Sequence, residues 1–192
     1  MTAFDLARVR TLLGRHAPQR VPIVPPLREA AVALVLAPSA EGGPALLFIK
    51  RAEHPRDPWS GQMALPGGRR DPSDADMLAT AIRETAEETG ITLQRDQVVG
   101  ELDDLSPVSP HLPPLVVRPF VFGLAEAPAV RLSAEATLHL WVPLASMVEH
   151  SAEETVVVAG ARQLTVPGYR IGPHFIWGMT ERIVSPLLGL LG

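Results

Sequence analysis

One helical segment, over about residues 74 to 89, constrains the fold of this chain more than any other. A helix advances by about 100° per residue, so Glu84, Glu87 and Glu88 share an arc of about 100°. The opposite arc is small or apolar and comprises Leu78, Ile82, Thr85, Ala86 and Thr89. Such a helix is suited to packing against a sheet, which would leave its acidic face pointing into a cleft.

Sequence signals mark both ends of this helix. Asp71-Pro72 indicates a turn, Ser73 can cap the N-terminus together with Asp76, and Gly90 follows the last turn as a C-cap. The sequence therefore predicts a helix over about 74–89.

A pair of glycines precedes the helix. Gly67-Gly68 permits positive φ and leaves a backbone carbonyl that no side chain blocks, so this loop can approach a metal or a phosphate. Arg83 lies four residues before Glu87 and can pair with it. Clustered hard oxygen ligands favour Mg²⁺ or Mn²⁺. The alternative is a solvated helix face with ion pairs, which the glycine loop and the Arg83-Glu84 pair disfavour.

Residues 68–91 resemble the Nudix box, whose pattern is Gly, five residues, Glu, seven residues, then Arg-Glu-apolar-x-Glu-Glu-x-Gly-apolar. Asp74 stands where the pattern has its first Glu, eight residues then precede Arg83, and Thr85 occupies an apolar position of the pattern. The resemblance implies a Nudix-type α/β/α sandwich with a mixed β-sheet. It also implies hydrolysis of a nucleoside diphosphate linked to another moiety.

The same resemblance implies roles for the residues of the box. Glu84 and Glu88 would hold Mg²⁺ or Mn²⁺, with Glu87 and the Gly68 carbonyl completing the metal site. Arg83 would brace Glu87. The number of metal ions, from one to three, stays open.

A cationic segment leads into the acidic site. Lys50 supplies a point charge, whereas Arg51 and Arg56 can present planar forks to phosphate. Arg51-Ala52, Arg56 and Gly61, followed by Leu-Pro-Gly-Gly at 65–68, resemble the second signature of the coenzyme A diphosphatase branch of the family. The gap before Gly61 is one residue longer, and Leu replaces the usual Phe. This resemblance implies that the segment, including Gly67 and Gly68, binds substrate.

Two downstream segments are similar to coenzyme A diphosphatases: Glu135 ahead of residues 141–144, and residues 176–180. By that resemblance Glu135 is a candidate to bind a second metal or to accept a proton from water. Other loop acids compete for this role, namely Glu149, Glu153, Glu154, Asp103 and Asp104.

The expected reaction is a metal-dependent pyrophosphatase reaction on coenzyme A or an acyl-coenzyme A, giving phosphopantetheine and 3′,5′-ADP. ADP-ribose, NADH, nucleotide sugars and dinucleoside polyphosphates are alternative substrates. A different class, a Nudix-like sensor that binds a nucleotide without cleaving it, is suggested by the departures at Asp74 and Thr85.

Composition indicates one enzyme domain over residues 1–192, because 46% of the residues are hydrophobic and 20% are charged. The absence of cysteine excludes disulfides and thiolate zinc sites. No apolar run reaches the roughly 18 to 20 residues that span a bilayer, and a net charge of −4 offers no broad basic surface for nucleic acid. We expect a cytoplasmic enzyme with a small nucleotide substrate and neither nucleic-acid nor membrane partners. Its apolar segments could equally serve a homodimer interface.

Apolar patterns predict the remaining elements. Strands are expected at 31–36, 45–49, 98–102, 115–122, 138–142 and 155–158. Helices are expected at about 4–14, near 143–149 and at about 177–191, where Pro186 should kink or break the helix. This order predicts a mixed sheet between helical layers.

Overall fold

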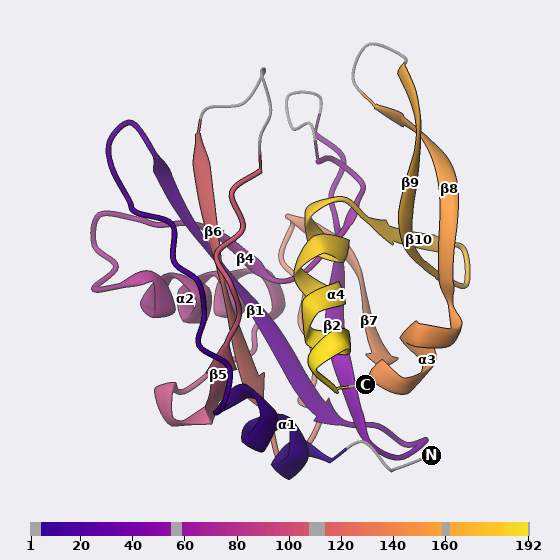
Figure 1. Ribbon diagram of the computed structural model, residues 1–192, viewed down its shortest axis with the longest axis horizontal. Helices are drawn as coiled ribbons and strands as arrows, with labels where there is room; N and C mark the ends of the chain where they lie inside the picture. The colour runs from indigo at the N-terminus through magenta and orange to yellow at the C-terminus, as the bar shows by residue number, and fades with distance from the viewer. Residues whose placement is uncertain (1–4, 55–58, 108–113, 159–161, 192) are drawn as a thin grey trace.

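The two faces of strand β1 (Arg28–Pro38) explain the layers of the fold. Ala30, Leu34 and Leu36 belong to a core that also contains residues of α1 (Leu6–Leu13) and α4 (Met179–Leu191). The alternate residues, such as Ala33 and Val35, belong to a second core that contains residues of α2 (Met77–Thr89). Figure 1 shows the sheet between these helices. The predicted α/β/α sandwich is therefore confirmed in this computed structural model, which describes residues 5–54, 59–107, 114–158 and 162–191.

The main sheet has seven strands and is mixed. Its central order is β3 (Met63–Ala64), β2 (Pro44–Arg51), β1, β6 (Leu115–Gly123) and β5 (Val98–Glu101), while β4 (Gly67–Arg69) pairs with β1 and β7 (Ala136–Pro143) pairs with β2. Strands β1 and β6 are parallel, and the other pairs are antiparallel.

Strands β1 and β2 diverge along their length, and this divergence positions the site. They pair at Leu36–Pro38, whereas Ala30–Val32 of β1 pairs with β4, and the end of β2 pairs with β3. The short strands β3 and β4 thus lie between the separated ends of β1 and β2. They bring the glycine pair beside α2.

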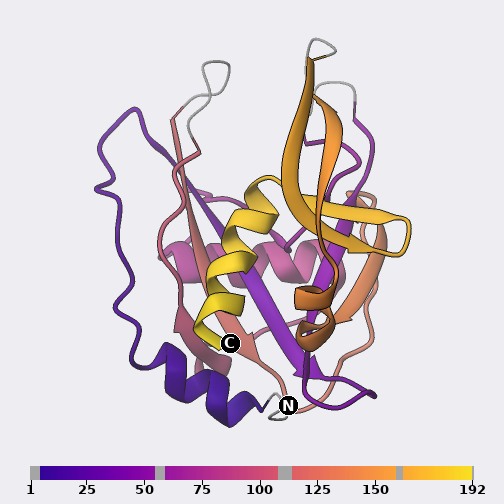
Figure 2. The same cartoon turned by 45° about the vertical axis from the view of Figure 1, so that its right-hand side comes forward.

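A separate three-stranded sheet covers one side of α4 (Figure 2). It consists of β8 (Ser151–Val158), β9 (Arg162–Ile171) and β10 (His174–Trp177), all antiparallel, and α3 (Leu144–Glu149) precedes it. A short 3-10 helix, Arg95–Gln97, precedes β5. Across the part of the chain described, no helix is long and apolar enough to cross a membrane.

The start of α2 differs from the prediction. Asp76, not Ser73, is the N-cap, since its carboxylate accepts the Ala79 N–H at 2.7 Å. Ser73 instead donates from its backbone and hydroxyl to Asp71, in a turn that the Asp74 N–H closes onto the Asp71 carbonyl. This turn delays the helix to Met77. Its predicted end is confirmed, because Gly90 adopts φ 71° as the C-cap.

Helix α4 continues through Pro186, so the predicted break is wrong. Pro186 lies on the exposed side of the helix, where the carbonyl that loses its partner can meet water. After Pro186, the helix residues Leu187, Leu188 and Leu191 are buried. Their packing against the core therefore stabilises the last turn of the helix.

Candidate active site

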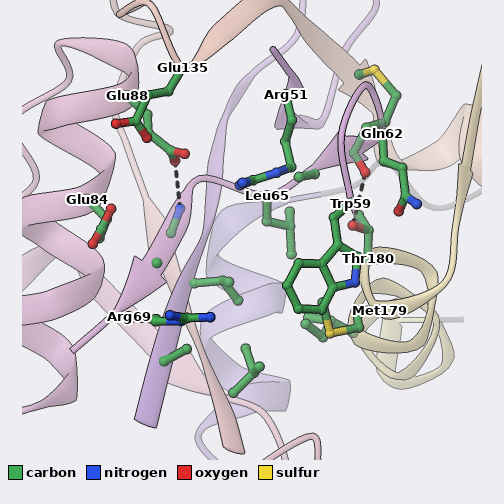
Figure 3. Close-up of a pocket in the computed structure, with 18 of the residues that line it drawn as sticks. Arg51, Trp59, Gln62, Leu65, Arg69, Glu84, Glu88, Glu135, Met179 and Thr180 are labelled. Carbon is green, nitrogen blue, oxygen red and sulfur yellow. Dashed lines mark hydrogen bonds between the residues drawn. The ribbon is translucent and has the colours of Figure 1, made fainter. Parts of the chain in front are cut away.

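The acidic face of α2 borders a cavity of about 470 Å³. Glu84 and Glu88 line it from α2, Glu135 from the segment before β7, and Gly67 and Gly68 from β4. In Figure 3 the three glutamates lie on one wall of this cavity. The expectation that α2 presents its carboxylates to a cleft thus agrees with the structure for Glu84 and Glu88.

Arg83 holds the acidic residues in place. Its Nη1 donates to Glu84 at 2.8 Å and to Glu87 at 3.0 Å, so the predicted pairing with Glu87 is present. Its Nη2 donates to the Arg69 carbonyl at 3.1 Å, and Nε and Nη2 donate to the two oxygens of Asp74 at 3.0 and 2.9 Å. Arg83 therefore fixes the acidic helix to strand β4 and to the turn before α2.

Glu88 is the most deeply buried of the three glutamates on α2, with 3% of its surface exposed. Burial raises its pKa to about 7, and the neighbouring carboxylates of Glu84 and Glu135 act in the same direction. The Gly67 N–H, which donates to Glu88 at 2.9 Å, and the charge of Arg51 partly oppose this rise. Burial of Glu88 therefore outweighs the hydrogen bond from Gly67 and the positive charge of Arg51.

A side chain at either glycine would clash with a neighbour, which is the β1 backbone for Gly67 and the Glu84 side chain for Gly68. Gly67 has φ 153°, and a Cβ there would lie 2.3 Å from the Ala31 carbonyl oxygen. A Cβ on Gly68 would lie 2.4 Å from the Glu84 carboxyl carbon. The Gly68 position thus leaves the space in which the Glu84 carboxylate lies.

This donor set suits a hard divalent cation such as Mg²⁺ or Mn²⁺. Glu84, Glu88 and Glu135 line one cavity, and a cation there would favour the ionised form of Glu88, which burial and the neighbouring carboxylates disfavour. Within the described ranges, however, no three acidic, histidine or cysteine side chains already converge as a ligand group. Glu87 pairs with Arg83, is largely exposed and does not line the cavity.

The cationic residues divide into three cases. Arg51 lines the cavity, and its charge acts on Glu88. Lys50, its neighbour on β2, is not among the lining residues. Arg56 lies outside the described residues. Arg69 also lines the cavity (Figure 3), and it was missed from the sequence. Its place directly after the glycine pair was the available signal.

Glu135 is the one candidate among the competing loop acids that borders the cavity. Its carbonyl accepts the Ala52 N–H at 2.7 Å, which ties its loop to the end of β2. Asp103 contacts His16, Asp104 pairs with Arg118, and Glu154 pairs with Arg170. These three acids, with Glu149 and Glu153, do not line the cavity. The geometry therefore favours Glu135 for the additional carboxylate.

The wall opposite the glutamates carries residues that the sequence did not assign to the site. Trp59 and Met179 lie there in Figure 3, and Thr180 donates to the Met63 carbonyl at 3.0 Å. That hydrogen bond joins the first turn of α4 to β3. The late segment at 176–180 thus reaches the cavity through Met179 and Thr180.

This chain is similar to proteins of a known family. A model of the NUDIX domain matches residues 26–159, which is more than half of the chain. The chain belongs to the Nudix family.

Nudix relatives match beyond that domain. The mitochondrial coenzyme A diphosphatase NUDT8 of Mus musculus is 31% identical over an alignment that covers 100% of this chain and 90% of that protein. The uncharacterized protein C14C4.10c of Schizosaccharomyces pombe is 33% identical, and the alignment covers 96% of this chain and 60% of that protein. The predicted hydrolase class and the resemblance to the coenzyme A diphosphatase branch are confirmed by the family and by the mouse relative.

The Nudix fold is also found by structural comparison. The crystal structure of a MutT/nudix family protein from Enterococcus faecalis gives a TM-score of 0.58. The match covers 98% of this chain and 80% of that chain at 16% identity, so it supports the fold alone.

Both departures from the Nudix box have structural roles. Asp74 is 8% exposed, and hydrogen bonds from Arg83 hold its pKa well below the usual range. Thr85 is fully buried, and its hydroxyl donates to the Ala81 carbonyl at 2.7 Å, so its polar atom is satisfied within the helix. Arg83 therefore binds both Asp74 and Glu84, although the loop before the helix is one residue longer than in the Nudix pattern.

Proposed function

We propose that this chain hydrolyses the diphosphate of coenzyme A or an acyl-coenzyme A in a metal-dependent reaction. The observation that carries the proposal is a single cavity in which Glu84, Glu88 and Glu135 oppose Arg51 and Arg69. Carboxylates suit a divalent cation, and guanidinium groups suit phosphate oxygens. The similarity to the mouse coenzyme A diphosphatase NUDT8 supports coenzyme A as the substrate.

The proposed metal is Mg²⁺ or Mn²⁺, held by Glu84 and Glu88, with the Gly68 carbonyl as a further donor. Such an ion would neutralise charge on the diphosphate and lower the pKa of a water molecule. Arg83 keeps Glu84 in position through the 2.8 Å hydrogen bond, and the absent Cβ of Gly68 leaves room for that carboxylate.

The chain's own groups account for the rest of the reaction. The oxygen of a water molecule forms a bond to one phosphorus as the bridging P–O bond breaks. Glu135 accepts the proton lost by that water, because it is the loop carboxylate at the cavity. Arg51, whose charge acts on Glu88, binds the phosphate oxygens as charge moves to the leaving group. The products from coenzyme A are phosphopantetheine and 3′,5′-ADP.

The apolar part of the cavity supports a substrate with a long organic arm. Val32, Leu115 and Val117 line it from the sheet, and Met179 and Ile183 line it from α4. The methyl and methylene groups of a pantetheine arm, or an acyl chain attached to it, can bury apolar surface there.

The test is incubation of the purified chain with Mg²⁺ or Mn²⁺ and coenzyme A, ADP-ribose, NADH or diadenosine polyphosphates, followed by chromatography. Phosphopantetheine plus 3′,5′-ADP as the dominant products is the expected result. Preferential cleavage of another compound would contradict the substrate and retain the reaction. Tight nucleotide binding with no product from any compound would favour the sensor class instead.

A further inference from the structure

A shallow hollow adjoins the catalytic cavity at the start of β1. It is bordered by three arginines, Arg28, Arg69 and Arg70, and by the acidic residues Glu29 and Asp71. Arg69 borders both this hollow and the catalytic cavity, so the two are adjacent at this residue.

Strand register brings two of these arginines together. Arg69 of β4 pairs with Ala30 of β1 in an antiparallel ladder, and Arg28 lies two residues before Ala30 on the same face. Diagonal neighbours of this kind have Cα atoms roughly 7–8 Å apart, within reach of long side chains. Ala30 itself lines the catalytic cavity, so the residues on this face of β1 lie next to that cavity.

The charges in the hollow are unequally matched. Arg70 donates to Glu29 at 2.7 Å, and Asp71 accepts from the Ser73 backbone and hydroxyl. In the part of the chain that the structure describes, the side chains of Arg28 and Arg69 have no hydrogen bond or ion pair. Both are exposed. Two neighbouring guanidinium groups without a carboxylate repel each other, and an anion between them would relieve that repulsion.

We infer that Arg28 and Arg69 form a binding site for a second phosphate group of the substrate, a phosphate monoester separate from the diphosphate that is cleaved. The inference rests on the proposed function, which places the diphosphate beside Glu84 and Glu88. In coenzyme A the matching group is the phosphate on the ribose. The site would select nucleoside diphosphate derivatives with this additional phosphate over those that lack it.

The experiment measures binding of 3′,5′-ADP and 5′-AMP to the intact chain by titration calorimetry, because these nucleotides differ by one phosphate. A hydrogen bond to a charged group contributes about 1.5–3 kcal/mol, which corresponds to about 10- to 100-fold in affinity. We expect 3′,5′-ADP to bind at least about 10-fold more tightly than 5′-AMP to the unmodified chain. Arg28→Gln and Arg69→Gln should each reduce this ratio by about 10-fold.

Arg10→Gln is the matched control, because Arg10 is exposed on α1, lines neither cavity and loses the same charge. Its affinity ratio should stay at that of the unmodified chain. A ratio near one in the unmodified chain, or a ratio that neither variant at Arg28 nor Arg69 changes, would overturn the inference. The expected ratios with no cleavage of coenzyme A would support this phosphate site and refute the proposed reaction. Cleavage of coenzyme A with a ratio near one would refute the phosphate site alone.

Discussion

Replacing Asp74 by Asn tests whether the residue that departs from the Nudix box anchors the acidic helix. The Asp74 carboxylate accepts four hydrogen bonds. The Arg83 Nε reaches Oδ1, whereas the Arg83 Nη2, the Thr80 hydroxyl and the Asp71 N–H reach Oδ2. An Asn side chain keeps three of these bonds if its oxygen takes the place of Oδ2. Its NH₂ group then faces the Arg83 Nε, so one charge-assisted bond and the ion pair are lost.

The expected cost follows from this count. A hydrogen bond to a charged group contributes about 1.5–3 kcal/mol, and a buried charge that loses its partner adds to the cost. The Asp74 side chain is buried, whereas the Arg83 side chain is 29% exposed and can recover some hydration. We therefore expect Asp74→Asn to lower the free energy of unfolding by about 2–4 kcal/mol at pH 7.

Urea unfolding followed by circular dichroism measures this difference. The pKa of Asp74 is lowered in the folded state, so its contribution to stability is present above the unfolded pKa of about 4 and is lost as the pH falls towards the folded value. The gap between the two proteins should therefore narrow below about pH 4. Asp96→Asn, at an exposed position, should change stability by less than about 0.5 kcal/mol. An Asp74→Asn cost as small as that of Asp96→Asn would refute the anchoring role.

Two further predictions concern Gly68 and Glu88. Gly68→Ala should lower the rate of hydrolysis by about 100-fold in steady-state kinetics, because the new Cβ would lie 2.4 Å from the Glu84 carboxyl carbon and displace that carboxylate. Gly189→Ala is the control, because a Cβ at Gly189 would meet no atom within 4 Å. Without divalent metal, stability should fall by on the order of 3 kcal/mol as the pH rises from about 4.5 to about 7, since the folded chain retains the Glu88 proton longer than the unfolded chain. Urea unfolding of Glu88→Gln should lack this component, and an unchanged pH profile would contradict the burial effect.

The sequence predicted the elements whose signals are local. The apolar and acidic arcs of α2 lie within one helix, and the glycine pair precedes it closely in the sequence, so the resemblance to the Nudix box was sufficient to assign Glu84 and Gly68 to one site. Strands β1, β2, β6 and β7 were also found, because each contains an apolar run such as residues 31–36 of β1. The ten-residue strand β9 was not predicted, and the two- and three-residue strands β3 and β4 are too short to carry such a run.

The site residues that reach the cavity through tertiary contacts could not be predicted from their spacing along the sequence. Arg69 enters the cavity through the pairing of β4 with β1, and Met179 enters it through the docking of α4 on β3. Asp74 was read as a departure from the box, although it binds Arg83 across nine residues of sequence. Ser73 was assigned the cap because the order of residues fits it, but the turn at Asp71 engages its side chain first.

The cleavage of coenzyme A by the unmodified chain and by Glu84→Gln, with Mg²⁺ or Mn²⁺ present, tests the proposed reaction most directly. The rates of phosphopantetheine and 3′,5′-ADP formation are measured by chromatography, and circular dichroism checks that each protein is folded. Glu149→Gln, at an exposed position outside the cavity, is the matched control. We expect both products from the unmodified chain and from Glu149→Gln, and a decrease of about 100-fold or more for Glu84→Gln. Near-normal cleavage by a folded Glu84→Gln protein would contradict the assignment of Glu84 to the catalytic site.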